Sequence, residues 1–312
     1  MTVQVDYDTT AIGWHGVSVR VPADWTLGAV GGDRKSGYLR VDDERMPRLQ
    51  LKWSQGHINL EKKRSEYAKR LTTGKRKRPT GLTVDLEARV ISGRSKPKKE
   101  LATFAWRGPQ CGMGVLWNCE VCNRALIAQV SWQQPERLHE VAQQVLGSLE
   151  DHAIGGWQLW GVDGFAFLAP EGYDLAKWKR MTRYLELTLT TKREATLRAV
   201  RWGMVALVLG GRTLMEWYQD ENRRRRDVRW QAQEMEVKGH QAVAAWGERR
   251  RFAGSLRKGL AKLLGRKPAV DFAACAWHCP DSNRIYLAET IYAEGQDVLK
   301  GVVDSILCHE EA

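Results

Sequence analysis

The sequence predicts an α+β protein made of two tandem copies of one domain, each a mostly antiparallel sheet covered by helices, in a pseudo-two-fold arrangement. Three observations favour this fold class. Residues 16–25 reappear as the similar segment 164–173, and residues 115–119 reappear as 275–279. Apolar and polar residues alternate along much of the chain, as they do in half-buried strands. Each half also ends in a segment with the apolar spacing of an amphipathic helix.

The first half offers a series of strands and two helices. Val17, Val19 and Val21 alternate with polar residues, and the same pattern occurs in later segments. The strands are expected at residues 17–21, 49–53, 82–90, 101–106, 112–118 and 124–132. Residues 60–71 are expected to form a charged helix. Residues 138–149 are expected to form a second helix, because their apolar residues recur at i, i+3, i+4 and i+7.

The second half follows a similar order. Its strands are expected at residues 165–168, 184–189, 197–202, 235–246, 270–278 and 284–292. A helix is expected at residues 213–226, and an amphipathic helix at 298–307 closes the half, as residues 138–149 close the first.

The repeat also gives the predicted domain organisation. Copy 1 covers residues 1–153 and copy 2 covers residues 154–312, so each has about the commonest size of a domain. A short connection separates Trp106 from Trp117 in copy 1, whereas a longer one separates their counterparts Trp246 and Trp277. Copy 2 is therefore expected to carry a basic insertion at about residues 249–268.

The opening motif of each half resembles the PsbP/DcrB-like family. A hydrophobic strand runs into Pro22-x-x-Trp25 in copy 1 and into Pro170-x-x-Tyr173 in copy 2. Short strands, a helix, a meander and a C-terminal helix follow in both. The resemblance implies one such domain per half. It also implies binding rather than catalysis, since members of this fold are mostly photosystem accessory subunits, small-GTPase partners, envelope lipoproteins and effector chaperones, without common catalytic residues.

Composition and charge narrow the classes of partner. The 312 residues include 49 Lys and Arg against 37 Asp and Glu, a net charge of +12. A basic surface suits nucleic acid, an anionic membrane surface or an acidic protein. No apolar run approaches the roughly 18 residues of a transmembrane segment. The first residues lack the basic leader and apolar core of a secretory signal, so we expect a cytoplasmic protein with reduced cysteines.

Basic residues gather in three segments that form a candidate partner-binding surface. Two runs follow the first helix of each half, and the third lies in the insertion, where leucines at helical spacing predict a basic amphipathic helix. Such a surface suits phosphate contacts, although charge runs are often only solvated. The candidate residues are Lys75, Arg76, Lys77, Arg78, Arg223, Arg224, Arg225, Arg226, Arg249, Arg250, Arg251, Arg257, Lys258, Lys262, Arg266 and Lys267.

Cysteines supply the candidate metal ligands. Cys119 and Cys122 lie where two strands should be joined by a turn, and Cys275 and Cys279 lie at the corresponding place in copy 2. Two thiolates on a hairpin turn are typical of a zinc knuckle. Pairing the two turns would give four sulfur ligands, or three together with His278. The alternatives are buried, unligated thiols and a redox-active or disulfide pair.

The sequence lacks the usual signatures of catalysis. It contains no Walker loop, no GxSxG and no HExxH, and its seven histidines show no pattern of paired carboxylates. We therefore predict a non-catalytic binding, adaptor or chaperone-like protein that recognises another protein through a groove between the duplicated domains. Two alternatives stay open. One is a nucleic-acid-binding protein that uses the basic face, and the other is a zinc-binding or thiol-active protein that uses the hairpin cysteines.

Overall fold

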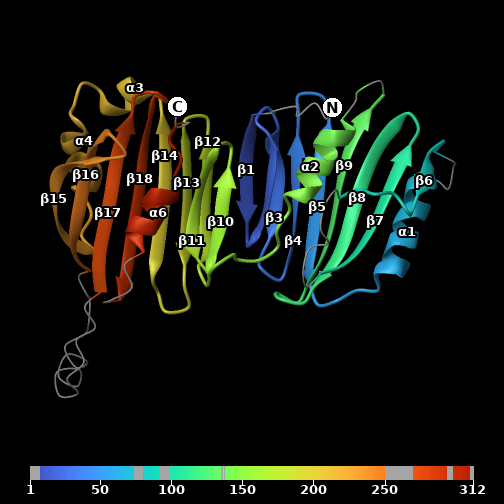
Figure 1. The fold of residues 1–312 in the computed structure, drawn as a ribbon. Coiled ribbons are helices and arrows are strands. Elements are labelled where there is room, and N and C mark those ends of the chain that lie inside the picture. Colours follow the sequence, from blue (N-terminus) through green and yellow to red (C-terminus); the bar gives the residue numbers. More distant parts are fainter. Residues whose placement is uncertain are drawn as a thin grey trace, which may run out of the picture. The chain divides into compact units, whose positions relative to one another are not determined.

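A computed structural model describes residues 8–73, 80–91, 99–134, 136, 138–249, 270–293 and 298–309 (Figure 1). The chain divides into two compact units, Met1–Ala166 and Phe167–Ala312. Of the described residues, 54% are in strands and 17% in helices. The strands form three antiparallel sheets of four, seven and seven strands. The protein is therefore β-rich, and the predicted α+β class, with helices covering each sheet, is wrong.

Unit 1 contains a seven-stranded sheet with the order β3-β4-β5-β9-β8-β7-β6. These strands are β3 (Thr26–Gly32), β4 (Ser36–Asp42), β5 (Pro47–Gln55), β6 (Thr83–Asp85), β7 (Lys99–Arg107), β8 (Gln110–Cys119) and β9 (Arg124–Gln133). Helix α1 (Leu60–Thr72) packs against β7, and helix α2 (His139–Gly147) packs against β9 (Figure 1).

Unit 2 contains a seven-stranded sheet with the order β12-β13-β14-β18-β17-β16-β15. These strands are β12 (Asp174–Met181), β13 (Tyr184–Thr190), β14 (Thr196–Gly203), β15 (Val228–Val237), β16 (His240–Arg249), β17 (Val270–Cys279) and β18 (Arg284–Ala293). Its described part also contains the helices α3 (Val205–Leu209), α4 (Leu214–Asn222) and α6 (Leu299–Ser305). The two large sheets share one topology. The first three strands in sequence lie side by side in chain order, and the next four follow them across the sheet in reverse chain order.

The third sheet has the order β11-β10-β1-β2. It contains β1 (Thr9–Trp14), β2 (Val17–Pro22), β10 (Trp157–Val162) and β11 (Phe165–Pro170). The boundary between the units falls within β11.

Short helices explain why the fold is β-rich. A seven-stranded sheet is about 29 Å wide at roughly 4.8 Å per strand. The longest helix among the described residues, α1, has 13 residues and is therefore only about 20 Å long. In addition, the single strand expected at residues 235–246 is a hairpin of β15 and β16, because Lys238 and Gly239 both adopt positive φ and turn the chain.

Two glycines of β8 determine how α1 packs on unit 1. A Cβ atom at Gly112 would lie 2.1 Å from the ring of Trp106, and one at Gly114 would lie 2.3 Å from the ring of Phe104. Their absence lets the two rings lie flat on the sheet, stacked with centroids 5.8 Å apart. Leu60 of α1 belongs to the same apolar cluster.

Arg48 of β5 forms a buried ion pair with two carboxylates of unit 1. Its guanidinium lies 2.5 Å from Asp43 and 2.7 Å from Glu136, and its side chain is 3% exposed. Hydrogen bonds from Arg48 lower the pKa of Glu136. Burial alone would raise the pKa of Asp43, but hydrogen bonds from Arg48 and from the Met46 backbone N–H lower it.

We expect Arg48→Met to lower the free energy of unfolding by roughly 2–3 kcal/mol at neutral pH, because it leaves the partly buried Asp43 without its cation and Glu136 with only the exposed Arg45. Both carboxyl groups have a lowered pKa in the folded protein, so their contribution is present above the unfolded pKa of about 4 and lost as the pH falls. Urea unfolding at pH 7 and pH 3 measures this. A difference between wild type and variant that does not shrink at pH 3 would contradict the assignment.

Candidate metal centre

Each unit contains one cluster of potential metal ligands. In unit 2 the cluster is His240, Cys279, Cys308 and His309, and in unit 1 it is Cys119, Cys122, Asp151 and His152. Within each cluster, one donor atom from every residue lies within 4.8 Å of all the others. These are the metal-ligand clusters that occur among the described residues.

Three segments that are distant in sequence form the unit 2 cluster. His240 opens β16 and Cys279 ends β17. Because these strands are antiparallel neighbours, the start of one lies beside the end of the other. Cys308 and His309 follow α6, which packs against β17 and β18 through buried Val302 and other apolar residues.

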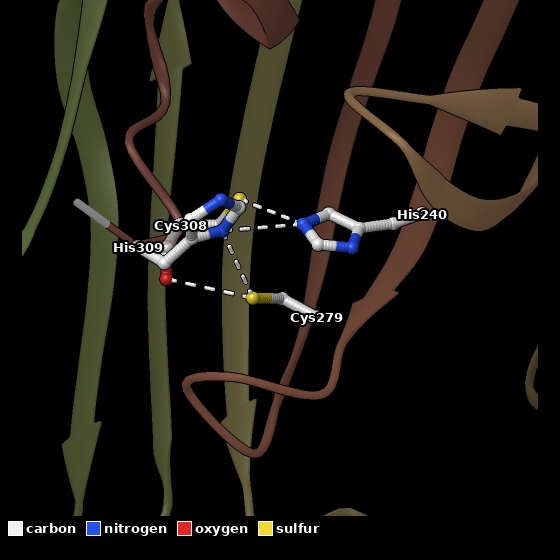
Figure 2. Close-up of side chains that lie close together, drawn as sticks. All are labelled: His240, Cys279, Cys308 and His309. Atoms are coloured by element: carbon white, nitrogen blue, oxygen red, sulfur yellow. Dashed lines mark hydrogen bonds between the residues drawn. The ribbon is translucent and has the colours of Figure 1, made fainter. Parts of the chain in front are cut away.

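The donor atoms of unit 2 point toward a common centre (Figure 2). His240 Nε2 lies 3.2 Å from His309 Nδ1 and 3.5 Å from Cys308 Sγ. His309 Nδ1 lies 3.3 Å from Cys308 Sγ and 3.4 Å from Cys279 Sγ. These four separations are nearly equal, and the remaining two, from Cys279 Sγ to His240 Nε2 and to Cys308 Sγ, are within 4.8 Å.

Burial and a second layer of contacts hold this cluster. Cys279 is fully buried, and His240 and Cys308 are 8% and 6% exposed. Burial raises the pKa of the Cys308 thiol. The Tyr286 hydroxyl donates to the Cys308 carbonyl at 3.3 Å. The Lys238 ammonium donates to the Ile306 carbonyl at 2.5 Å, which fixes the segment that follows α6.

The unit 1 cluster is built on corresponding elements with different donors. Cys119 ends β8, Cys122 lies in the turn before β9, and Asp151 and His152 follow α2. Cys119 Sγ lies 3.5 Å from His152 Nδ1, which is 2.8 Å from Asp151 Oδ1. Lys99 pairs with Cys119 across the β7–β8 ladder.

Asp151 is the electrostatic centre of the unit 1 cluster. Its carboxylate accepts a 2.6 Å hydrogen bond from Trp117 Nε1 and lies 3.2 Å from the Lys99 ammonium. Burial opposes its charge, but Lys99 and Trp117 lower the pKa of Asp151 below its usual range. Burial, together with the nearby Asp151 carboxylate and Cys119, raises the pKa of Cys122 to about 12. Without a cation, the Cys122 side chain is therefore a neutral thiol.

The metal ligands predicted from the sequence lie in different places in the structure. Cys119 and Cys122 lie together in unit 1, and Cys279 lies in the unit 2 cluster. Cys275 lies outside both clusters within β17, where burial raises its pKa to about 12. His278 also lies outside, since it alternates with Cys279 and lies on the opposite face of the strand.

Sequence reasoning missed the partners supplied by other segments, which are Asp151, His152, His240, Cys308 and His309. One signal was present. In both halves a dipeptide ending in histidine follows the closing helix, Asp151-His152 in the first half and Cys308-His309 in the second.

The described part of the predicted basic surface is not uniform. Arg223, Arg224 and Arg226 are exposed. Arg225 instead points inward, where it lies 2.6 Å from the buried Glu289 carboxylate and over the Phe272 ring at 4.6 Å. Arg249 ends β16. The other candidates lie outside the described residues, namely Lys75, Arg76, Lys77, Arg78, Arg250, Arg251, Arg257, Lys258, Lys262, Arg266 and Lys267.

We expect Arg225→Ala to lower the free energy of unfolding by about 2–4 kcal/mol, because Glu289 is 5% exposed and loses its shortest ion pair. The exposed neighbour provides the control, since Arg224→Ala should change stability by less than about 0.5 kcal/mol. Urea unfolding of the two variants makes the comparison. Equal effects would show that Arg225 is only a surface residue of the basic run.

Comparisons with known proteins identify no relatives. A scan against protein-family models matches no family, and a search of curated proteins finds no significant match. Over the described part of the chain, no helix has the length and apolar composition needed to cross a membrane. The chemistry of the two clusters must therefore be argued from their own geometry.

Proposed function

We propose that this chain is a zinc-binding protein in which unit 2 holds one Zn²⁺ ion through His240, Cys279, Cys308 and His309. Two thiolates and two imidazoles are a common ligand set of structural zinc sites. The charges also balance, since two thiolates neutralise the ion and the imidazoles bind it in their neutral form.

The spacing of the donor atoms is the observation that carries this proposal. A tetrahedral zinc ion, with bonds of about 2.05 Å to nitrogen and 2.3 Å to sulfur, places its ligands roughly 3.3–3.8 Å apart. The four donor separations given above lie between 3.2 and 3.5 Å. Only small movements would therefore be required for the ion to enter.

A structural role suits this site best. Four protein ligands leave no open coordination position for a substrate, as is typical of structural rather than catalytic zinc. The ion would join the start of β16, the end of β17 and the segment after α6. Such a role accords with a binding or adaptor protein. That its partner is another protein stays a prediction.

Metal analysis of the purified full chain tests the proposal. We expect Cys308→Ser to reduce the zinc content by one equivalent per chain relative to wild type. Cobalt-substituted wild type should show thiolate-to-cobalt charge-transfer absorption that weakens in the variant. Cys275→Ala is the matched control, because Cys275 lies in the same sheet but outside the cluster, and it should keep the full zinc content. Equal zinc in wild type and Cys308→Ser, in correctly folded protein, would refute the unit 2 site.

A further inference from the structure

We propose that unit 1 carries a second zinc site, formed by Cys119, Cys122, His152 and Asp151, and that this site exchanges its ion more readily than the unit 2 site. The inference deepens the proposed function and uses the unit 2 site as its reference. It nevertheless stands on a separate set of donor atoms, which lie within 4.8 Å of one another in the described part of unit 1.

Corresponding elements supply the donors of the two sites. Cys119 and Cys279 are the last residues of β8 and β17. These strands hold the same place in the strand orders of their sheets. His152 and His309 each follow the helix that packs on the same part of the sheet, α2 or α6. We infer that the halves arose by duplication and that unit 1 retains a metal centre with altered ligands.

Two ligands of unit 2 have different counterparts in unit 1. Asp151 stands where unit 2 has Cys308, and Lys99 stands in β7 where His240 stands in β16. Unit 1 compensates with Cys122 of the turn, which has no cysteine counterpart in the turn after Cys279. The outcome is again four donors, with two sulfurs, one imidazole and one carboxylate, all of which are known zinc ligands.

Lys99 makes this donor set electrically compatible with a divalent ion. Its side chain is 3% exposed and lies 3.2 Å from Asp151 Oδ1, so its charge offsets that of the carboxylate. Zinc binding would form two Zn–S bonds and release the two thiol protons to solvent. The two thiolates would then neutralise the ion, as in unit 2.

The same contacts explain why the unit 1 site should be weaker. The carboxylate of Asp151 is already shared by Trp117 Nε1 and Lys99, which reduces its strength as a donor. Its 2.8 Å contact with His152 Nδ1 must lengthen to about 3.3 Å before both can bind one ion. Cys122 and His152 are also only half-buried, so water and chelators can reach the ion.

Zinc stoichiometry of the full chain, kept under reducing conditions, tests the second site. We expect two zinc ions in wild type, one in Cys119→Ser/Cys122→Ser and one in Cys279→Ser/Cys308→Ser. A graded challenge with a chelator should remove the unit 1 ion at least tenfold more easily. Cys111→Ser is the control in the same unit, because Cys111 is a buried thiol outside the cluster, and it should keep both ions.

The outcomes separate the two proposals. One zinc ion in wild type that persists in Cys119→Ser/Cys122→Ser would overturn the second site and leave the proposed function standing. One zinc ion in wild type that is lost in Cys119→Ser/Cys122→Ser would instead support the unit 1 site and refute the unit 2 site. A disulfide between Cys119 and Cys122 in protein purified under zinc, seen as two missing free thiols after denaturation, would also overturn the second site.

A gain-of-function variant guards against loss of zinc through misfolding. Lys99→His/Asp151→Cys gives unit 1 a counterpart of each of the four unit 2 ligands and keeps Cys122 as an additional thiol. We expect it to bind the unit 1 ion at least tenfold more tightly than wild type, as measured by the same chelator challenge. Unchanged or weaker retention of the ion in a folded variant would contradict the correspondence of the two sites.

Discussion

Replacing Cys279 with alanine should remove the dependence of unit 2 stability on zinc. A ligand that binds only the folded state adds about 1.4 kcal/mol to the free energy of unfolding for every tenfold rise in its free concentration, and about 4 kcal/mol at 1,000 times its Kd. Cys279 is a fully buried donor of the proposed site. Wild type should therefore become steadily more stable as buffered free zinc rises, whereas Cys279→Ala should not respond in unit 2.

The helix α6 should report this effect most clearly. It has seven residues, too few to be stable by itself, and it ends three residues before Cys308. Without the ion, its docking depends on apolar residues such as Val302 and Ile306. We expect amide hydrogens of α6 to lose protection from exchange before those of β17. Cys275→Ala serves as the control, and it should keep the response to zinc. A variant Cys279→Ala that is stabilised by zinc as strongly as wild type would refute the role of this thiol.

The most apolar strands could be predicted from the sequence, whereas several others could not. β5, β8 and β9 are flanked by strands on both sides, and their apolar residues mark them clearly. The strands that escaped prediction include the edge strands β3 and β12 and most of the edge strand β15, and also β1, β4 and β10, which have neighbours on both sides. Edge strands have one neighbour and often carry glycine or charged residues that protect the edge. Because these strands were missed, the share of helix in the fold was overestimated, and the predicted fold class was wrong.

The candidate site shows a similar division. The pattern of two strands joined by a turn places Cys119 and Cys279 at strand ends, and the structure has them there. Their partners could not be found in this way, because His240 and His309 are 69 residues apart in sequence. Only the sheet order and the return of the chain through α6 bring them together. Arg225 illustrates the same limit, since nothing within a run of four arginines indicates which one points inward.

Lowering the pH should release the unit 2 ion steeply. Zinc binds thiolates, and an ordinary thiol has a pKa of about 8.5; burial raises the pKa of Cys308 further. Below this range, each ion must displace two thiol protons, so its apparent affinity should fall about 100-fold per pH unit.

This pH dependence is measured best in Cys119→Ser/Cys122→Ser, where unit 2 holds the only proposed site. Competition with a chromophoric chelator at pH 6, 7 and 8 gives the slope, and calorimetry in buffers of different ionisation enthalpy counts the released protons. We expect two. His240→Cys in that background replaces an imidazole by a third thiol, so the slope should rise to about 1,000-fold per pH unit. A slope of one proton or less in the unmodified site would mean that Cys279 and Cys308 do not both bind the ion.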